Sequence, residues 1–581
     1  MRRGMRAALA ALTIAVATAG IAGTAQAATG QTIKGYIPMS DGVTLAYQVV
    51  LPDPEQFGDG PYPTVMDYSG YGPGRTVNYS LDTRFVERGY ALAGVNIRGT
   101  GCSGGKFDYF EERQSVDGKE AIEWLTDQPW SNGRLAMVSK SYPGITQLFV
   151  AAQRPEGLVA ITPGHVFGDL YRDVPYPGGI LNIAFSAAWP LAVQPASSTA
   201  QSVQGVVGGD AECTANQVEH APNPRYNAFV QAWEHRYDDD LFRERSPYEF
   251  VDRIEVPTLL VESWQDEQVG SRASNLAERF DPSVDWHLLA SNGDHNEYYG
   301  DAVLPELQAF VDAHVKGEGT YDRPRVIVQW EKGGDRIPRF TTGHDAFPPS
   351  DHQVQRFYLH GDGALRDAPP AEGAAGSTSY GYLPVAGTHN QIWSSTPPDG
   401  SRAVFTTPPL AEDVAWLGSG SLDLKLASTA PDTDLEVLVS EVRPDGQEVY
   451  VQRGWLRASQ RKLDPSRTTD TRPYQTHRQA DVELLTPGQT EDVRVELFPT
   501  GHVFRAGSSL RIWIQAPAAF SGLWGFVPTP LPALNTITHT AAHPSSLALP
   551  VVEVDAPDQL PSCADLRNQP CRDNPLPVPA G

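Results

Sequence analysis

Two patterns of apolar and polar positions alternate over the first half of the chain. Short apolar runs with the character of buried strands are separated by segments in which apolar residues recur at helical spacing. The apolar runs are Thr64–Tyr68, Ala91–Ile97, Leu135–Ser139, Val159–Thr162, Pro257–Ser263 and Trp286–Ala290. The helical segments include Leu81–Arg88, Gly118–Leu125 and Ile145–Ala152. Strands that alternate with helices form βαβ units, so the pattern predicts an α/β domain with a mainly parallel sheet.

A long segment interrupts this alternation. Residues 167–249 are rich in aromatic and helix-compatible positions and contain no clear strand pattern. We therefore expect residues 28–166 and 250–322 to form the two parts of one α/β domain. Residues 167–249 are expected to form a helical cap inserted above its sheet.

The pattern of polar and apolar residues changes at about Arg323. Short runs of alternating polar and apolar residues, such as Val354–Leu359 and Leu510–Ile514, are separated by Gly, Pro, Asp and Ser. This spacing predicts an all-β sandwich or jelly roll over residues 323–550. Residues 551–581 are rich in proline, and we expect them to wrap the surface as a tail.

The first 27 residues have the pattern of a secretory signal peptide. Three arginines precede an apolar run that reaches about Ile21, and the small residues around Ala25 and Ala27 follow it. The apolar run is shorter than a bilayer span of about 20 residues. We expect residues 1–27 to be cleaved, and the remaining chain to be secreted without a membrane anchor.

The net charge and the cysteines limit the classes of function that the sequence supports. The formal net charge of the 581-residue chain is −25, and an acidic surface repels phosphate backbones, so nucleic-acid binding is disfavoured. Cys563 and Cys571 are close in sequence and predict a local disulfide. Cys102 and Cys213 are candidates for a second bridge, which the sequence alone leaves open. No Cys/His cluster has zinc spacing, and we expect neither a metal nor another cofactor.

The segment Met137–Gly144 has the context of a nucleophile elbow, because a strand pattern precedes it and a helical run follows. The usual motif is Gly-x-Ser-x-Gly. Here Ser139 replaces the first glycine, and the second falls one position late, at Gly144. Small residues let the backbone approach closely around such a turn, which these two partly allow. Ser141 is the candidate nucleophile, with a Ser-rich structural loop as the alternative, and the turn would point Lys140 toward the surface.

A candidate acid and a candidate base follow Ser141 in chain order. Asp266 and His295 each come just after a predicted buried strand, and the order Ser, Asp, His is that of α/β-hydrolases. Loops at the carboxyl ends of parallel strands are where such sheets bind ligands. Asp294 and Glu267 are rival acids. The alternatives are a solvated loop position for the histidine and a helix cap for the aspartate.

Several motifs together resemble one family. They are Asn96–Gly105, Gln128–Gly133, Ser141–Gly144, Asp169–Arg172, Trp264–Asp266, Gly293–His295, Thr406–Leu410 and Gly501–Arg505. This set spans nearly all of the chain after the signal peptide. It resembles the cocaine esterase/X-Pro dipeptidyl-peptidase (CocE/NonD, peptidase S15) family of serine hydrolases. In that family the elbow reads Gly-x-Ser-Tyr-x-Gly, so only the first position, Ser139, departs from it here.

The resemblance implies a fold, an activity and roles for residues. The fold is an α/β-hydrolase domain with a helical cap, followed by a jelly roll of galactose-binding-like type. The activity is hydrolysis of an ester or amide through an acyl-enzyme on Ser141, with His295 as general base. Asp266 falls on the family's Trp-x-Asp pattern and is the implied acid. The hydroxyl of Tyr71 and the backbone N–H of Tyr142 are the implied donors of the oxyanion hole.

Candidate substrate contacts follow from residue type. Trp264 and Trp189 are candidates for the wall of an apolar pocket, with core packing as the alternative. In peptidase-like and amino-ester-hydrolysing relatives a carboxylate holds the free amine of the substrate, and Asp169, Asp173 and Glu267 are candidates for it. We expect the partners to be small-molecule esters or amides, or short peptides.

Two other functions stay open on the sequence alone. An X-Pro dipeptidyl-peptidase would use the same triad but would require a free amine on its substrate. A hydrolase scaffold that has lost catalysis and binds a ligand such as a carbohydrate would also carry an altered elbow.

Overall fold

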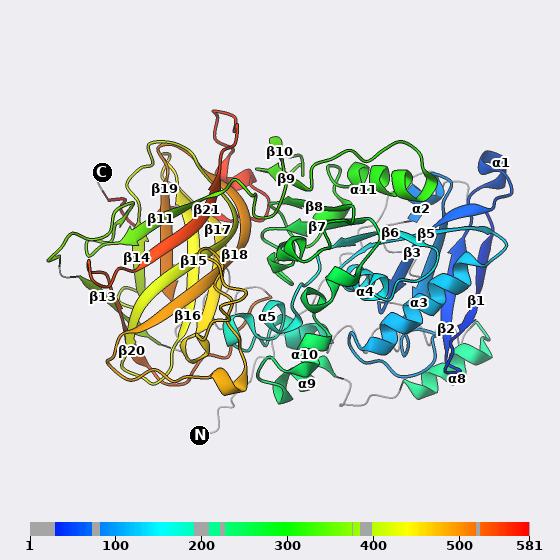
Figure 1. The fold of residues 1–581 in the computed structure, drawn as a ribbon, viewed down its shortest axis with the longest axis horizontal. Coiled ribbons are helices and arrows are strands. Elements are labelled where there is room, and N and C mark those ends of the chain that lie inside the picture. Colours follow the sequence, from blue (N-terminus) through cyan, green and yellow to red (C-terminus); the bar gives the residue numbers. More distant parts are fainter. Residues whose placement is uncertain are drawn as a thin grey trace, which may run out of the picture.

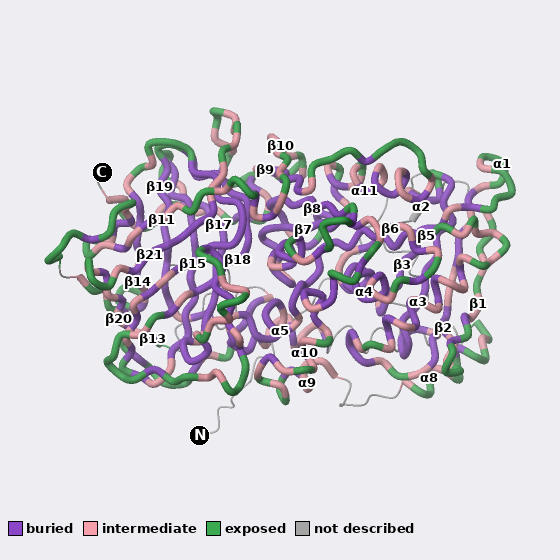
Figure 2. The backbone as a smooth tube through the Cα atoms, in the orientation of Figure 1, coloured by how far each residue is buried: buried purple, intermediate pink, exposed green. Residues whose placement is uncertain are grey.

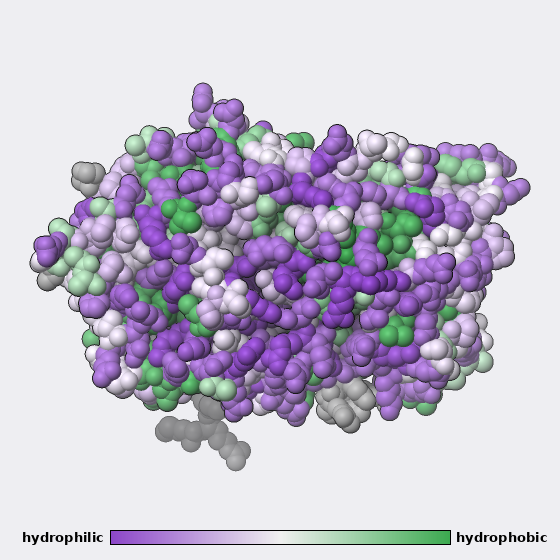
Figure 3. All heavy atoms as spheres, viewed as in Figure 1, coloured by the Kyte–Doolittle hydropathy of each residue, from purple (hydrophilic) through white to green (hydrophobic). Residues whose placement is uncertain are grey.

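The computed structural model describes residues 30–71, 82–190, 208–220, 227–374, 376–383, 398–518 and 523–579. The predicted signal peptide lies outside these residues. Two lobes lie side by side, an α/β lobe from the first part of the chain and a β lobe from the second (Figure 1). Within the described ranges, no helix combines the length and the apolar character needed to cross a bilayer. Hydrophilic residues cover most of the face drawn in Figure 3.

The α/β lobe is built on a ten-stranded sheet of order β1-β2-β4-β3-β5-β6-β7-β8-β9-β10. The strands from β3 to β9 are parallel to their neighbours, whereas β1 and β2 at one edge and β10 at the other are antiparallel. The predicted, mainly parallel sheet is therefore confirmed. The strands are β1 (Thr32–Pro38), β2 (Thr44–Val50), β3 (Tyr62–Ser69), β4 (Ala91–Asn96), β5 (Ser131–Lys140), β6 (Leu158–Gly164), β7 (Thr258–Ser263), β8 (Trp286–Ser291), β9 (Val326–Trp330) and β10 (Phe340–His344).

Helices cover both faces of this sheet. Successive residues of a strand point to opposite faces, so Met66 of β3 packs toward α3 and α4, and Val65 packs toward α2 and α11. Both faces are apolar, which is why the central strands appear in the sequence as continuous apolar runs. The helices of this lobe are α1 (Pro54–Phe57), α2 (Asp82–Val86), α3 (Glu112–Thr126), α4 (Tyr142–Ala151), η6 (Arg272–Glu278), η7 (Glu297–Tyr299), α11 (Leu304–Val311) and the π-helical turn η8 (Asp312–Lys316).

The sheet continues further along the chain than predicted. β9 pairs in parallel with β8, and β10 pairs with β9 at the edge, so residues up to His344 contribute to the α/β sheet. The prediction that residues from 323 onward belong to the β-rich domain is wrong for these two strands. A short buried strand carries no local signal for the sheet that it joins, because long-range packing decides its neighbours.

Between β6 and β7 the regular elements that the structure describes are helical. They are α5 (Leu170–Asp173), η2 (Pro177–Gly179), α8 (Ala211–Glu219), α9 (Ala228–Glu234), α10 (Asp240–Glu244), η4 (Pro247–Glu249) and η5 (Val251–Arg253). In Figure 1, α5, α9 and α10 lie below the sheet, on the side of the β lobe. A disulfide between Cys102 and Cys213 joins the loop after β4 to α8.

The β lobe is a sandwich of two antiparallel sheets, as the fold class predicts. One sheet has the order β12-β11-β21-β15-β20-β13, with β18 paired to β15, and the other has the order β14-β19-β16-β17-β22. Apolar side chains such as Leu424 and Val439 meet between the sheets, whose strands are largely buried (Figure 2). The elements are β11 (Gln353–Leu359), β12 (Leu365–Arg366), β13 (Ser377–Tyr382), β14 (Arg402–Thr406), β15 (Val414–Ser428), β16 (Asp434–Val442), β17 (Gln447–Arg457), η9 (Ala458–Gln460), η10 (Gln479–Asp481), β18 (Glu491–Phe504), β19 (Ser509–Gln515), β20 (Ala533–Thr538), β21 (Ser546–Val552), η11 (Cys563–Asp565) and β22 (Cys571–Asp573).

Candidate active site

Ser141 lies in a sharp turn between β5 and α4. Its backbone has φ 61° and ψ −139°, a conformation that residues with a side chain rarely adopt. Main-chain hydrogen bonds hold the turn, from Ser141 N to Gly164 O and from Ile145 N to Ser141 O, each at 2.8 Å. Gly144 is required here because a Cβ at this position would lie 2.8 Å from Gly164 O. A strained serine between a parallel strand and a helix is the geometry of a nucleophile elbow.

Ser139, which stands where the elbow motif has glycine, has an acidic neighbour. Its side chain is buried, and its hydroxyl lies 3.5 Å from Oδ2 of Asp67 on β3. Burial raises the pKa of Asp67 to about 8, and the hydrogen bond from Ser139 opposes only part of this rise. Asp67 is therefore mostly protonated at pH 7.

Asp67→Asn is expected to stabilise the protein at pH 8 and to have little effect near pH 4. The folded-state pKa of Asp67, about 8, lies above the ordinary value of 3.8. Between these pH values the native state binds a proton that the unfolded state releases, so the free energy of unfolding falls as pH rises. Asparagine cannot ionise and removes that fall. The gain at pH 8 is on the order of 5 kcal/mol, since the shift spans about four pKa units and each unit corresponds to about 1.4 kcal/mol.

Urea unfolding of the wild type and Asp67→Asn between pH 4 and pH 8 measures this effect. Asp59→Asn, at an exposed position, is the control and should track the wild type across the range. A stability difference that stays constant from pH 4 to pH 8 would contradict the assignment of a raised pKa to Asp67.

Asp266 and His295 come from the loops that follow β7 and β8. Nδ1 of His295 is 2.7 Å from Oδ2 of Asp266, and Oδ1 of Asp266 accepts a hydrogen bond from the backbone N–H of Val269 at 3.1 Å. Both side chains are buried. Burial alone would raise the pKa of Asp266, but His295 and His165 beside it hold the pKa far below its ordinary value. Asp266 is therefore an ionised carboxylate that orients the imidazole.

The rival acids make other contacts. Glu267 accepts a hydrogen bond from the backbone N–H of His295, at 3.1 Å, and not from its ring. Asp294 forms an ion pair with Arg567 at 2.7 Å. Of the three carboxylates considered from the sequence, Asp266 is the one that contacts the imidazole of His295.

His165 is a second buried histidine beside Asp266, which the sequence analysis missed. Its Nε2 accepts a hydrogen bond from the backbone N–H of Tyr298 at 3.1 Å. The proton of the neutral ring is therefore on Nδ1, which lies 3.5 Å from Oδ2 of Asp266. Burial lowers the pKa of His165 to about 4, so the ring is neutral at pH 7. The available sequence signal was its position directly after Gly164, at the carboxyl end of β6.

His165, Asp266 and His295 also form the one His, Asp and Glu cluster within the described ranges that is compact enough for a metal ion. A histidine nitrogen that binds a metal must be deprotonated. In His165 the Nε2 lone pair accepts the N–H of Tyr298, so Nδ1 keeps the proton. This set suits hydrogen bonding to a carboxylate better than metal binding.

The hydroxyl of Ser141 faces the first predicted oxyanion donor. Its Oγ lies 3.0 Å from the hydroxyl of Tyr71, just after β3. Tyr142 is the first residue of α4, where a backbone N–H has no acceptor within its own helix. Nε2 of His295 is buried and has no hydrogen-bond partner among the described residues, so Ser141 is not bonded to it in this structure.

An apolar cavity opens beside Ser141. The ring of Trp189 meets the rings of Tyr71 and Tyr142 edge to face, with centroids 6.0 and 5.8 Å apart. The charged residue among the described lining residues is Arg245, and it forms an ion pair with Asp108 at 3.1 Å. The remaining wall is mostly apolar and includes Tyr109, Phe110, Ile145, Phe167, Leu170, Phe185 and Phe242.

Two predicted substrate contacts are contradicted. Trp264 is 1% exposed and stacks on Phe347, with ring centroids 5.8 Å apart, so it belongs to the core. Asp169 caps α5, pairs with Arg172 at 2.6 Å and lines a separate, smaller cavity. Both were selected by motif position, which does not indicate where a side chain points. Trp189, in contrast, lines the Ser141 cavity as predicted.

Lys140 was expected at the surface but is half-buried. Its Nζ donates to the backbone carbonyl of His295 at 2.7 Å and to the side-chain oxygen of Asn296 at 2.6 Å. Burial lowers the pKa of Lys140 to about 8. The residue next to Ser141 in sequence therefore holds the loop that carries His295.

Models of known protein families match both lobes. The model of X-Pro dipeptidyl-peptidase (S15 family) matches residues 41–297, and the model of the X-Pro dipeptidyl-peptidase C-terminal non-catalytic domain matches residues 318–548. The chain belongs to this family of serine hydrolases. The predicted family and the predicted enzyme class are confirmed. Residues after 548, including the disulfide-closed tail, lie outside both family models.

Relatives of this S15-family hydrolase include enzymes that act on esters. The cocaine esterase of Rhodococcus sp. (strain MB1 Bresler) is 24% identical over 595 residues, which cover 89% of this chain and 98% of the relative. The solved structure of a CocE/NonD family hydrolase from Staphylococcus aureus matches with TM-score 0.74 and 22% identity, over 90% of this chain and 94% of that one. An α-amino acid ester hydrolase structure matches with TM-score 0.69 and 20% identity, over 93% and 100%. The fold of the S15-family chain is that of these hydrolases.

Proposed function

We propose that this S15-family hydrolase is a secreted esterase or amidase that acts through Ser141, His295 and Asp266. The observation that carries the proposal is the 2.7 Å hydrogen bond between His295 Nδ1 and Asp266, in a site that also holds the strained Ser141. A carboxylate on Nδ1 favours the tautomer in which Nε2 is unprotonated and able to accept a proton. Nε2 of His295 has no hydrogen-bond partner among the described residues.

The proposed reaction is acyl transfer in two steps. His295 takes the proton of Ser141 as Oγ attacks the substrate carbonyl, and then gives it to the leaving group as the tetrahedral intermediate collapses. The resulting acyl-enzyme is hydrolysed by a water molecule that His295 deprotonates. The negative oxygen of each intermediate accepts hydrogen bonds from the hydroxyl of Tyr71 and the backbone N–H of Tyr142.

The proposal requires one side-chain rotation. Ser141 Oγ is close to Tyr71, at 3.0 Å, and must turn about its Cα–Cβ bond to reach His295. Hydrogen bonds between catalytic groups are often long or misaligned before substrate binds. With Oγ turned toward His295, the proposed role of the Tyr71 hydroxyl is to donate a hydrogen bond to the substrate oxygen.

The cavity favours an uncharged substrate with a bulky apolar acyl group. Its described lining residues include no carboxylate, and its arginine is already paired. Asp169 and Asp173, the predicted partners of a substrate amine, are paired with Arg172 and Arg272 instead. Aromatic and branched acyl groups would bury their surface against the rings of the wall.

X-Pro dipeptidyl-peptidase activity is the second candidate function, because both matching family models are named for it. Such an enzyme needs an acceptor for the protonated amine of its substrate. Glu267 is the remaining predicted candidate, and its carboxylate accepts the backbone N–H of His295. Glu267 is not among the described residues that line the cavity, and none of those residues is acidic, so the ester function is better supported.

A substrate panel on the wild type and Trp189→Ala tests the proposed function. We expect p-nitrophenyl benzoate to be hydrolysed with kcat/KM at least about 100-fold above that of Ala-Pro p-nitroanilide. Trp189→Ala should lower kcat/KM for the benzoate by about ten-fold, because the aromatic acyl group loses an apolar wall.

The acetate ester is the matched control substrate. Its methyl group has much less apolar surface to bury than a benzoyl ring, so Trp189→Ala should lower its kcat/KM far less. If Ala-Pro p-nitroanilide is the better substrate, and N-acetylation of the anilide abolishes its cleavage, the protein is a dipeptidyl-peptidase.

Secretion is part of the proposed function. It is supported by the signal-peptide pattern of residues 1–27 and by the pairing of all four cysteines, Cys102 with Cys213 and Cys563 with Cys571. Disulfides persist in oxidising compartments and are rare in the cytosol.

A further inference from the structure

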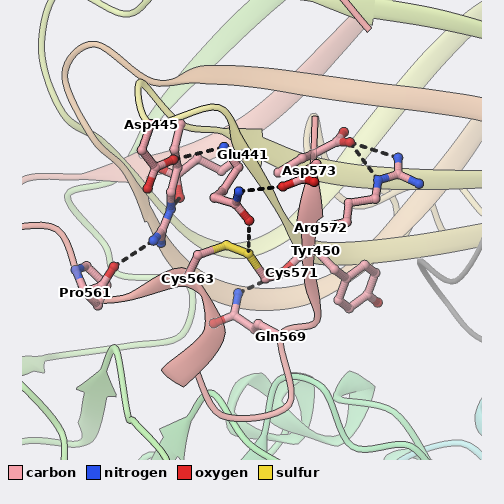
Figure 4. Close-up of a disulfide and its surroundings, with 12 residues drawn as sticks. Glu441, Asp445, Tyr450, Pro561, Cys563, Gln569, Cys571, Arg572 and Asp573 are labelled. Carbon is pink, nitrogen blue, oxygen red and sulfur yellow. Dashed lines mark hydrogen bonds and ion pairs between the residues drawn. A yellow bond between two sulfur atoms is a disulfide. The ribbon is translucent and has the colours of Figure 1, made fainter. Parts of the chain in front are cut away.

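The loop between Cys563 and Cys571 is fixed on the β lobe. A disulfide joins the two cysteines (Figure 4), and β22, which begins at Cys571, pairs with β17. The side chain of Gln569 donates to the backbone carbonyl of Tyr450 at 3.0 Å. The two residues midway along this loop, Arg567 and Asn568, point away from the sandwich and contact the α/β lobe.

Arg567 contacts the segment that carries His295. Its Nη2 donates to Asp294 and its Nε donates to Glu297, each at 2.7 Å. Its backbone carbonyl accepts a hydrogen bond from the side chain of Asn292 at 3.2 Å. These partners flank His295 on both sides. The segment lies between β8 and η7 and has no regular secondary structure of its own, so such contacts decide its conformation.

Asn568 contacts the loop that carries Asp266. Its Nδ2 donates at 2.7 Å to the backbone carbonyl of Gln265, the residue that precedes Asp266. The side chain of Gln265 in turn accepts the backbone N–H of Gly293 at 3.2 Å. Two adjacent tail residues therefore hold the segments on both sides of the hydrogen bond between Asp266 and His295.

The oppositely charged side chains at this contact stabilise one another. Glu297 is 1% exposed, and a buried carboxylate is unfavourable unless cations pair with it. Lys332 and Arg567 lie at 3.2 and 2.7 Å from its oxygens. Removing Arg567 would leave Glu297 with less compensation and Asp294 without its ion pair, so the segment between them would move.

We propose that Arg567 and Asn568 are positioning residues for the Asp266–His295 pair, and that the Cys563–Cys571 disulfide holds them in place. This inference rests on the proposed function of that pair. Neither tail residue lines the Ser141 cavity, so their effect should be on the chemical step and not on substrate binding. The loop lies beyond residue 548, where the second family model ends, so it adds an element to the matched domains.

Arg567→Gln tests the proposal in the full-length, oxidised protein. We expect kcat for p-nitrophenyl benzoate to fall by about 10- to 100-fold, with KM changed by less than about two-fold, because small displacements of catalytic groups slow chemistry. Arg567→Lys should retain a higher kcat than Arg567→Gln but not the wild-type value. Lysine keeps the positive charge but cannot donate from two separate nitrogens.

The matched control is Asp573→Ala. Asp573 belongs to the same tail but accepts its hydrogen bond from Gln447 of β17, at 2.8 Å, and should keep the wild-type kcat. The double variant Cys563→Ser with Cys571→Ser frees the loop and should lower kcat in the same direction as Arg567→Gln.

A double-mutant cycle shows whether Arg567 acts through the His295 segment. The losses of log kcat in Arg567→Gln and Asp294→Asn should add to more than the loss in the double variant. Thermal unfolding is measured for each protein. If Arg567→Gln does not fold, Asn568→Gly takes its place, since glycine adopts the positive φ of 54° and lacks the side chain that donates to Gln265.

Fluorophosphonate labelling separates the two proposals. If Ser141 of the wild type is not labelled, the proposed function fails. If Ser141 is labelled and the folded Arg567→Gln or Asn568→Gly protein keeps the wild-type kcat, the positioning role is overturned while the proposed function stands. If Ser141 of the tail variants is labelled more slowly than in the wild type but to the same final extent, the positioning role is supported.

Discussion

Ser141→Ala is expected to lower kcat for ester hydrolysis by about 10⁴-fold or more, because no acyl-enzyme can form without the attacking oxygen. The main-chain hydrogen bonds of the turn, to Gly164 O and from Ile145 N, do not involve the hydroxyl, so the variant should fold. Steady-state hydrolysis of p-nitrophenyl benzoate measures the loss. The other members of the proposed triad and the proposed oxyanion donors remain, so a small rate above that of water should persist.

Ser186→Ala is the matched control for this variant. Ser186 lines the same cavity but donates its hydroxyl to the backbone carbonyl of Asn182, and its replacement should leave kcat within about two-fold of wild type. Peptide mapping after fluorophosphonate treatment should place one adduct on Ser141. An adduct on another residue, or a retained kcat in Ser141→Ala, would exclude Ser141 as the nucleophile.

Tyr71→Phe is expected to lower kcat by about 10²- to 10³-fold and to leave KM nearly unchanged, as for loss of one oxyanion donor. In its proposed role the hydroxyl stabilises the transition state and not the bound substrate, because the negative oxygen develops only during the attack. The ring contacts of Tyr71 with Tyr142 and Trp189, at 5.8 and 6.0 Å between centroids, are kept by phenylalanine. The cavity should therefore keep its shape.

The comparison of kcat with KM decides the role of Tyr71. Tyr176→Phe is the control, because it removes a tyrosine hydroxyl that donates to Ala232 O within the cap, at 2.8 Å, away from Ser141. This variant should retain the wild-type kcat. A raised KM with an unchanged kcat in Tyr71→Phe would mean that the hydroxyl binds the substrate and is not an oxyanion donor.

The local parts of the site could be predicted from the sequence. The turn at Ser141 lies where the apolar run of β5 changes to the helical spacing of α4, and Asp266 and His295 follow β7 and β8. Each of these features depends on neighbours a few positions away, which periodicity and turn chemistry record. The motifs also identified the family, which the comparisons confirm.

Side-chain direction could not be predicted from the same motifs. Trp264 stands two residues before Asp266 yet packs against Gly501 of β18 and stacks on Phe347. Asp169 also belongs to a family-like motif, but Arg172 neutralises it. The two strands after 323 joined the α/β sheet although they stand next to the strands of the sandwich in the sequence.

By itself the sequence determined the order of strands and helices, the sharp turn around the candidate nucleophile, the sequence order of acid and base, and membership of a serine hydrolase family. Only the tertiary structure decided that His165 faces Asp266, that Lys140 holds the His295 segment, and that Arg567 reaches it from 270 positions away. Local spacing carries no information about such pairs. They meet because whole sheets bury their apolar faces, and this packing brings distant polar groups together at the edges.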